Sequence, residues 1–137
     1  MNRFDFNVEG YTAKLRKHLS MFFKERGVES YYQKASDEAK FPYITYELRA
    51  MNALDDSNAG KRYIMEINAY NREKETILEN LLDFLEQELD GFREKTPDMF
   101  FYSMLAYNRI DIEEDEPLKR KRVNYEINYW TKECTIR

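Results

Sequence analysis

The stretch from residue 61 to residue 91 most constrains what this chain can fold into, because its hydrophobic period changes there. In residues 61–71, apolar side chains alternate with polar ones, which is typical of a half-buried strand. In residues 73–90, apolar residues recur at spacings of three and four and predict an amphipathic helix: Ile77, Leu78, Leu81, Leu82, Leu85 and Leu89. A strand that runs almost directly into a helix leads us to expect that the helix folds back across its own sheet.

The ends of this helix also have sequence signals. Asn71 is placed where a residue that caps a helix N-terminus is expected, and Glu73 and Glu75 follow in the first turn, near the positive end of the helix dipole. Gly91 can adopt the left-handed conformation that closes a last turn. We therefore predict that the helix begins just after Asn71 and ends just before Gly91.

The rest of the chain reads as one further helix and several strands. Residues 8–26 predict a helix that Gly27 stops, and residues 28–33 predict a short edge strand. Strand patterns also cover residues 43–50, 99–112 and 122–131, whereas residues 34–40 and 51–60 are rich in loop formers. The apolar positions predict this core: Leu15, Leu19, Phe22, Ile44, Leu48, Met65, Ile67, Ile77, Leu81, Leu85, Leu89, Val123 and Ile127.

The order of these elements predicts the fold class. Strands that follow one another directly pair mostly antiparallel, and two helices can cover only one sheet face. We therefore predict an α+β, two-layer fold, with a mostly antiparallel sheet of four to five strands and two main helices packed on one face. Residues 1–137 form a single domain in this prediction, with loosely ordered tails at residues 1–7 and 132–137.

Composition and charge exclude several classes of function. A net charge of −4 and a pI near 5.2 argue against a general nucleic-acid binder, which carries a basic surface. A single cysteine excludes an internal disulfide framework and suits a reducing compartment. The first residues lack the apolar core of a signal peptide, and no run approaches the roughly 18 apolar residues of a membrane span. We expect no membrane partner.

No pattern of residues predicts an enzyme. His18 is the only histidine, and the sequence nominates neither a nucleophile nor an orienting group for it. Cys134 has no second cysteine or nearby histidine, and the four glycines stand alone rather than in a phosphate-binding loop. We expect no catalytic residue, no cofactor, no metal and no small-molecule substrate.

Charge is concentrated between the last two predicted strands. The acidic residues could bind a hard cation, but they lack the ligand spacing of a calcium loop, so a solvated hairpin tip is the simpler interpretation. The basic residues after Pro117 complete a segment with acid on one side and base on the other, which suits contacts between identical copies. The candidate interface residues are Glu113, Glu114, Asp115, Glu116, Lys119, Arg120 and Arg122, together with Asp55 and Asp56 in the loop of residues 51–60.

Several of these stretches resemble a known family. Phe41-Pro42-Tyr43 opens a strand, Asp115-Glu116-Pro117 forms an acidic turn, and residues 125–129 close the chain with aromatic alternation. Over roughly residues 10–131 the chain resembles the tail-terminator proteins of tailed bacteriophages and prophages, also described as tail-completion, head-to-tail joining or minor tail proteins. The resemblance implies a small α+β subunit without catalytic residues. The sequence departs from the family pattern in its polar residues 34–40.

The first of two candidate functions, implied by the resemblance, is that of a structural assembly protein. Such a subunit forms a ring, as a hexamer, that ends the tail tube and joins it to the head connector. Its partners would be other copies of itself, the tail tube protein and the head-tail connector protein. It would act in the bacterial host cytoplasm during assembly and then in the virion tail. The alternative is a small module that binds single-stranded nucleic acid, without sequence specificity, on a tyrosine-rich sheet face.

Overall fold

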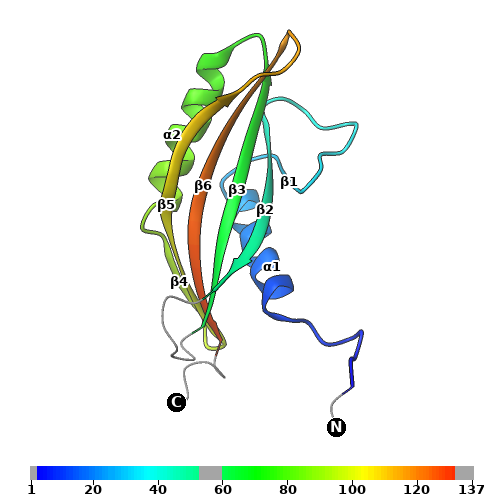
Figure 1. Cartoon of the computed structure of the whole chain (residues 1–137), viewed down its shortest axis with the longest axis vertical. Coiled ribbons are helices and arrows are strands. Elements are labelled where there is room, and N and C mark those ends of the chain that lie inside the picture. Colours follow the sequence, from blue (N-terminus) through cyan, green and yellow to red (C-terminus); the bar gives the residue numbers. More distant parts are fainter. Residues whose placement is uncertain (1–2, 53–59, 132–137) are drawn as a thin grey trace.

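The computed structural model describes residues 3–52 and 60–131 of the chain (Figure 1). Residues 3–10 form an arm that projects from the body ahead of the first helix. The helices and strands are α1 (Tyr11–Glu25), β1 (Ser30–Tyr32), β2 (Tyr43–Met51), β3 (Lys61–Arg72), α2 (Glu75–Leu89), β4 (Arg93–Lys95), β5 (Met99–Ile112) and β6 (Leu118–Thr131). Neither helix in this part of the chain is long and apolar enough to cross a membrane.

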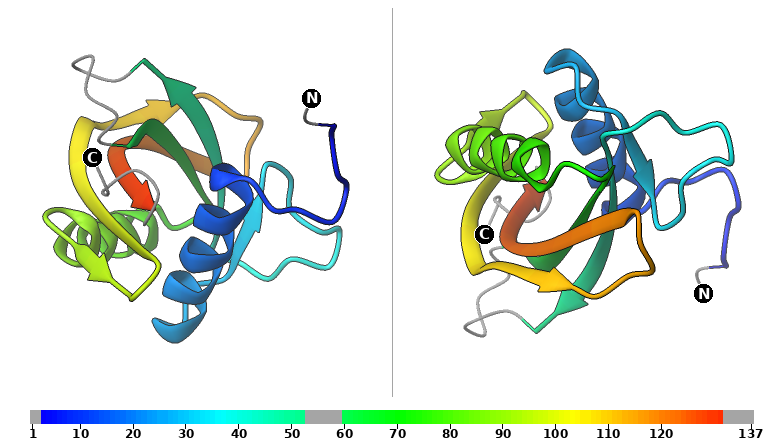
Figure 2. Two further views of the ribbon diagram at one scale, coloured as in Figure 1. Left: turned by 90° about the horizontal axis from the view of Figure 1, so that it is seen from below. Right: turned by 90° about the horizontal axis from the view of Figure 1, so that it is seen from above.

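The sheet is larger and more strongly curved than the sequence predicts. Its order is β1-β2-β3-β6-β5-β4, in which β1 pairs parallel with β2 and every other pair is antiparallel. The sheet curls into half a barrel, and the two helices lie along its open side (Figure 2). α2 contacts β3, β5 and β6, whereas α1 lies beside β1.

The predicted two-layer fold, with four to five mostly antiparallel strands and two helices packed on one face, is therefore wrong. β4 is only three residues long, too short to show an alternating pattern, and residues 33–42 return the chain so that β2 runs parallel to β1. Strands of 12 and 14 residues accumulate twist, and register shifts near Tyr107 interrupt the β5–β6 pairing and add curvature.

The hydrophobic core fills the concave side of this sheet. Its largest fully buried side chains include Tyr125, Tyr129, Phe23 and Phe101. All predicted core residues are buried except Ile77 and Leu81, which are half-buried. α2 is turned slightly from the predicted orientation, so its buried stripe is Leu78, Leu82, Leu85 and Leu89.

The start of α2 also differs from the prediction. Asn71 still belongs to β3, where it pairs with Lys119, and the helix cap is Lys74, which makes no side-chain capping bond. The Asn71 side chain instead donates from Nδ2 to the Lys74 carbonyl at 2.9 Å, so it supports the turn between strand and helix. The left-handed conformation predicted for Gly91 is confirmed by its φ of +82°.

Candidate functional site

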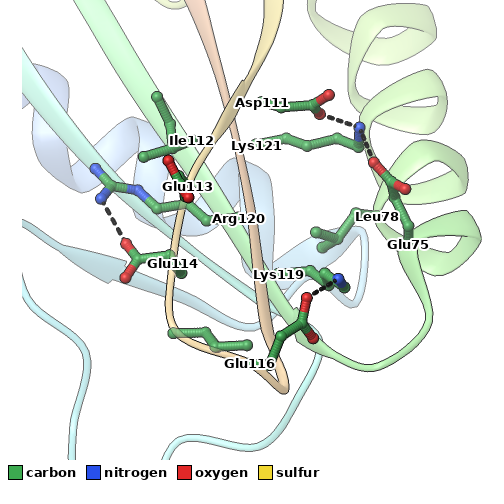
Figure 3. A pocket seen from close by; sticks show the side chains of 11 residues that line it. Glu75, Leu78, Asp111, Ile112, Glu113, Glu114, Glu116, Lys119, Arg120 and Lys121 are labelled. Carbon is green, nitrogen blue, oxygen red and sulfur yellow. Dashed lines mark hydrogen bonds and ion pairs between the residues drawn. The ribbon is translucent and has the colours of Figure 1, made fainter.

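The β5–β6 hairpin and the adjacent end of α2 enclose the hollow that contains most of the predicted interface residues (Figure 3). The hollow has a volume of about 220 Å³. Glu75 and Leu78 line it from α2, and β5, the turn and β6 supply Asp111, Ile112, Glu113, Glu114, Glu116, Leu118, Lys119, Arg120 and Lys121. The long flanking strands hold this end of the hairpin in place.

Strand alternation divides the basic residues of β6 between the two sides of the sheet. Lys119 and Lys121 pair with Asn71 and Ala69 and point to the concave side, whereas Arg120 and Arg122 pair with β3 residues of the convex side. The basic cluster is therefore two separate pairs of cations. Sequence reasoning treated it as one patch because the strand was predicted to begin only at residue 122.

The predicted acid and base residues pair largely within the subunit. Lys119 Nζ lies 2.5 Å from Glu116 Oε1, and this hydrogen bond raises the pKa of Lys119. Arg120 Nη1 lies 2.9 Å from Glu114 Oε1. Among the described residues, the side chains of Glu113 and Asp115 make no ion pair or hydrogen bond. Within the described part of the predicted interface, these two carboxylates are therefore not engaged inside the subunit.

Asn68 organises the convex side and was missed as a site residue. Its Oδ1 accepts hydrogen bonds from Arg120 Nε at 3.0 Å and from Arg122 Nε at 3.2 Å. Its Nδ2 donates to Glu66 at 3.3 Å, and Glu66 lies 3.6 Å from Arg122 Nε. Only the pairing register of β3 and β6 shows that Asn68 lies between the two arginines.

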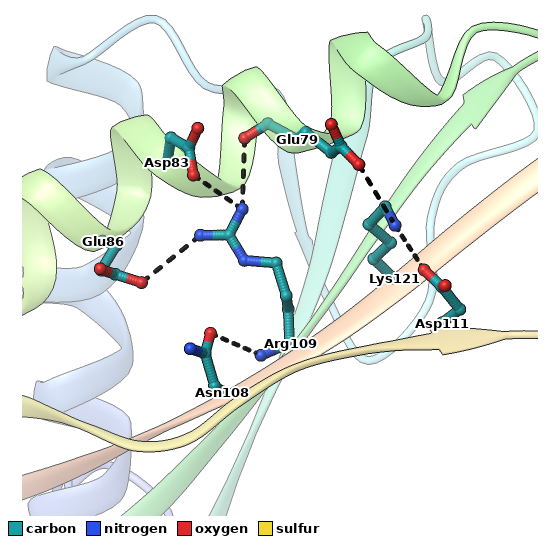
Figure 4. Close-up of polar contacts among 7 residues, drawn as sticks. All are labelled: Glu79, Asp83, Glu86, Asn108, Arg109, Asp111 and Lys121. Atoms are coloured by element: carbon teal, nitrogen blue, oxygen red, sulfur yellow. Dashed lines mark hydrogen bonds and ion pairs between the residues drawn. The ribbon is translucent and has the colours of Figure 1, made fainter.

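Lys121 connects the hairpin to α2 on the concave side. Its Nζ lies 2.8 Å from Glu75 Oε1 and contacts Asp111 Oδ1 (Figure 3), and it is 4.0 Å from Glu79 Oε1 (Figure 4). Burial acts to lower the pKa of Lys121, but hydrogen bonds to Asp111 and Glu75 outweigh it and the pKa is raised. The ammonium group therefore stays charged and holds the two elements together.

Arg109 makes a second link between β5 and α2. Its Nη1 lies 2.8 Å from Asp83 Oδ1 and its Nη2 lies 3.4 Å from Glu86 Oε1 (Figure 4). The acidic face of α2 thus meets cations from both long strands. These contacts are ion pairs within the subunit. They restrict the Arg109 side chain, which therefore has little freedom to contact a partner.

Aromatic side chains gather near the start of β2, where the nucleic-acid alternative would place its bases. The Tyr43 and Tyr70 rings stack with centroids 5.0 Å apart, and Phe41 lies 5.3 Å from Tyr43. Arg72 lies 5.2 Å from the Phe41 centroid, and Arg120 lies 5.6 Å from the Tyr70 centroid. The rings and guanidinium groups therefore contact one another first, which leaves less ring face for a base.

The remaining candidates form no catalytic arrangement in the described residues. His18 is one-third exposed on α1, with Nδ1 3.5 Å from Glu94 Oε2 and its ring beside Phe101. Across residues 3–52 and 60–131, no group of three or more histidine, cysteine or acidic residues could hold a metal ion. Asp55, Asp56 and Cys134 lie outside the described residues.

A comparison of the sequence with family models and with curated proteins finds no match to this chain. A functional proposal for the protein therefore rests on its own residues and their arrangement, together with the resemblance of the three motifs named above. The features that such a proposal must use are the convex sheet face, the charged hairpin and the projecting arm.

Proposed function

We propose that the protein is a non-enzymatic structural subunit of a phage or prophage tail. Copies of it form a ring, a hexamer, which ends the tail tube and joins it to the head connector. The ring assembles in the bacterial host cytoplasm and remains in the virion tail. The observation that carries the proposal is the convex face of the half-barrel, which neither helix covers (Figure 2). On this face Asn68 holds the charged side chains of Arg120 and Arg122 in place.

The fixed side chains of this face suit a docking surface. Asn68 and Glu114 hold Arg120, and Arg62 and Glu126 form an ion pair at 2.7 Å on the same face. The hydrogen bond from Arg62 lowers the pKa of Glu126, so this carboxylate stays charged. Binding normally costs the ordering of flexible side chains, and that cost is smaller when they are already ordered. A repeated subunit gains from such a surface because each contact is made in every copy.

A closed ring requires two separate contact surfaces on each subunit. In a closed ring each contact is head-to-tail, so one surface meets a different surface of the next copy. The hairpin presents the exposed side chains of Glu113 and Asp115 at one end of the long strands, without an ion pair to any residue that the structure describes. A neighbouring copy or the tail tube can supply the matching cations. Exposed ion pairs contribute about 0–1 kcal/mol each, so they set orientation more than affinity.

The experiment that tests this function removes the protein from an otherwise intact phage or prophage. We expect cells that lack the chain to make tails of uncontrolled length and heads without tails, as seen by electron microscopy. Supplying the chain from a plasmid should restore uniform tails joined to heads. Tails of normal length and normal joining without the chain would contradict the proposal.

The aromatic cluster of Phe41, Tyr43 and Tyr70 supports a second candidate, a module for single-stranded nucleic acid. Base stacking on such rings would give affinity with little sequence preference. Fluorescence anisotropy with a labelled oligothymidine tests it directly, because binding through phosphates weakens steeply as salt rises. Steeply salt-dependent binding that is lost in Tyr43→Ala/Tyr70→Ala would favour this candidate over the structural role.

A further inference from the structure

The arm ahead of α1 has the sequence of a strand but no sheet to join. It alternates strictly between polar and apolar side chains over Arg3, Phe4, Asp5, Phe6, Asn7, Val8 and Glu9. Phe4, Phe6 and Val8 are 80%, 90% and 70% exposed. The arm makes a local turn, in which Val8 N donates to the Asp5 carbonyl, and at its base Glu9 Oε2 lies 2.5 Å from Lys17 Nζ of α1. Strict alternation is the pattern of a strand with one buried face. The arm therefore carries an apolar face that this subunit does not cover.

The edge of β5 has the opposite property, a strand without a neighbour. β4 pairs with residues 100–102 of β5, and the chain after α2 bonds to Ser103, but in the described residues no strand flanks residues 106–112 on the side away from β6. Tyr107 and Ile110 in this segment are 67% and 54% exposed. They pair with Asn124 and Arg122, so both point to the convex side. Open strand edges readily accept another strand.

We propose that residues 3–9 of one copy pair with the β5 edge, residues 106–112, of a second copy. The arm would become a further strand of the neighbour's sheet, and Phe4, Phe6 and Val8 would cover Tyr107 and Ile110. Main-chain hydrogen bonds give such strand addition its affinity, and alternate side chains give it specificity. This inference rests on the proposed self-association and names the contact that makes it.

Length and position favour a second copy over the arm's own sheet. Seven extended residues span at most about 25 Å, and the open edge also has seven residues. The arm leaves the body beside α1 and β1, whereas β5 lies across the molecule (Figures 1 and 2). Nothing lies within 4 Å of the position where a Cβ of Gly10 would be, so the space beside the base of the arm is open. The resulting contact is head-to-tail, as a ring requires.

Cross-linking between two marked copies tests the pairing. In a Cys134→Ser background, an isotope-labelled chain carries Asp5→Cys and an unlabelled chain carries Asn108→Cys. A short bismaleimide then joins cysteines that lie close together. We expect the mixed product at about ten times the yield obtained with Lys34→Cys as the second site, because pairing raises the effective concentration of the two thiols. Equal yields at the two sites would overturn the proposal.

Two further parts of the experiment identify the source of the cross-linked product. Phe4→Ser/Phe6→Ser/Val8→Ser should reduce the mixed product to the control yield, whereas Met21→Ser, at an exposed apolar residue of α1, should not. A link that forms within one chain carrying both Asp5→Cys and Asn108→Cys, at high dilution, would overturn pairing between copies. The mass of the assembly, measured by native mass spectrometry, separates the ring proposal from the arm contact. An oligomer that the arm variant leaves intact overturns the arm contact alone. An unsubstituted chain that stays monomeric at every concentration, with and without the tail tube, overturns the ring as well.

Discussion

Lys121 and Glu75 join β6 to the first turn of α2, with Nζ 2.8 Å from Oε1 across 46 residues of sequence. The Lys121 side chain is only 8% exposed, whereas Glu75 is half exposed, so the contact is anchored from the sheet side. Asp111 binds the same ammonium group from β5. One lysine therefore ties three elements together at the end of the sheet that carries the candidate interface.

Lys121→Met should lower the free energy of unfolding by about 1–3 kcal/mol, because hydrogen bonds to a charged group are lost in a nearly buried position. Methionine keeps most of the side-chain volume. Lys119→Met is the matched control, since the Lys119 ammonium group forms an ion pair with the nearby Glu116 and its side chain is a third exposed. Urea unfolding followed by circular dichroism measures both. Equal losses in the two variants would show that Lys121 does not hold the elements together.

Leu85→Ala should cost about 2–5 kcal/mol of stability, since its side chain is fully buried and truncation leaves a cavity. Leu81→Ala should cost clearly less, because Leu81 is half-buried at the margin of the core. The pair tests the orientation of α2 by chemical denaturation. The reverse order of the two losses would mean that the helix presents a different face.

The raised pKa of Tyr125 predicts how the stability of the protein responds to alkaline pH. The Tyr125 hydroxyl group is buried and has no hydrogen-bond partner among the described residues, and burial raises its pKa above the usual value of 10.0. The folded state therefore holds the proton more tightly than the unfolded state does. The associated stability is complete below about pH 10 and is lost as the pH rises above it.

Tyr125→Phe removes both the unpaired hydroxyl and this titration. We expect stability at pH 7 to be unchanged or about 1 kcal/mol higher, because no hydrogen bond is lost. Above pH 10 the variant should lose stability less steeply than the unsubstituted chain. Thermal unfolding from pH 7 to 11 measures the difference. A marked loss of stability at pH 7 would show that the hydroxyl has a partner after all.

Substitution of Glu113 and Asp115 tests the role of the hairpin in assembly more sharply than substitution of its basic residues does. Reversing Lys119, Arg120 and Arg122 would also break contacts with Glu116, Glu114 and Asn68 inside the subunit. Glu113→Lys/Asp115→Lys changes two exposed side chains that pair with none of the described residues, so we expect folded subunits that assemble poorly.

The control for this charge reversal is Asp37→Lys/Glu38→Lys, in the loop between β1 and β2, which changes the net charge equally at exposed positions. Circular dichroism would confirm the fold of each variant, and electron microscopy of tails would report assembly. Normal rings and tail lengths from the hairpin variant would return the hairpin to a simple solvated turn.

Sequence periodicity predicted the elements that carry strong, long patterns. Residues 43–50, 99–112 and both helices were predicted close to their actual bounds, because alternation and leucine spacing report directly which side chains are buried. Ile44 and Leu48 are buried in the core as expected. The short edge strand predicted within residues 28–33 is also confirmed as β1, at the edge of the sheet.

The curl and the site depended on information that a local pattern does not contain. Twist accumulates over whole strands, and the pairing register that places Asn68 between Arg120 and Arg122 is a property of two segments that lie far apart in sequence. Asn71 was given to the helix because it is a common capping residue, but β3 pairing extends through Arg72. The alternation of residues 3–9 is present in the sequence, but the prediction assigned residues 1–7 to a loosely ordered tail and residues 8 and 9 to the first helix.

The oligomeric state of the purified chain tests the central claim most directly. Native mass spectrometry across a wide range of protein concentration measures it, with electron microscopy to show the shape of any assembly. The account predicts a closed ring of identical subunits, with six copies, in the presence of its tail tube or at high concentration. A chain that stays monomeric at every concentration, with and without the tube, would contradict the account.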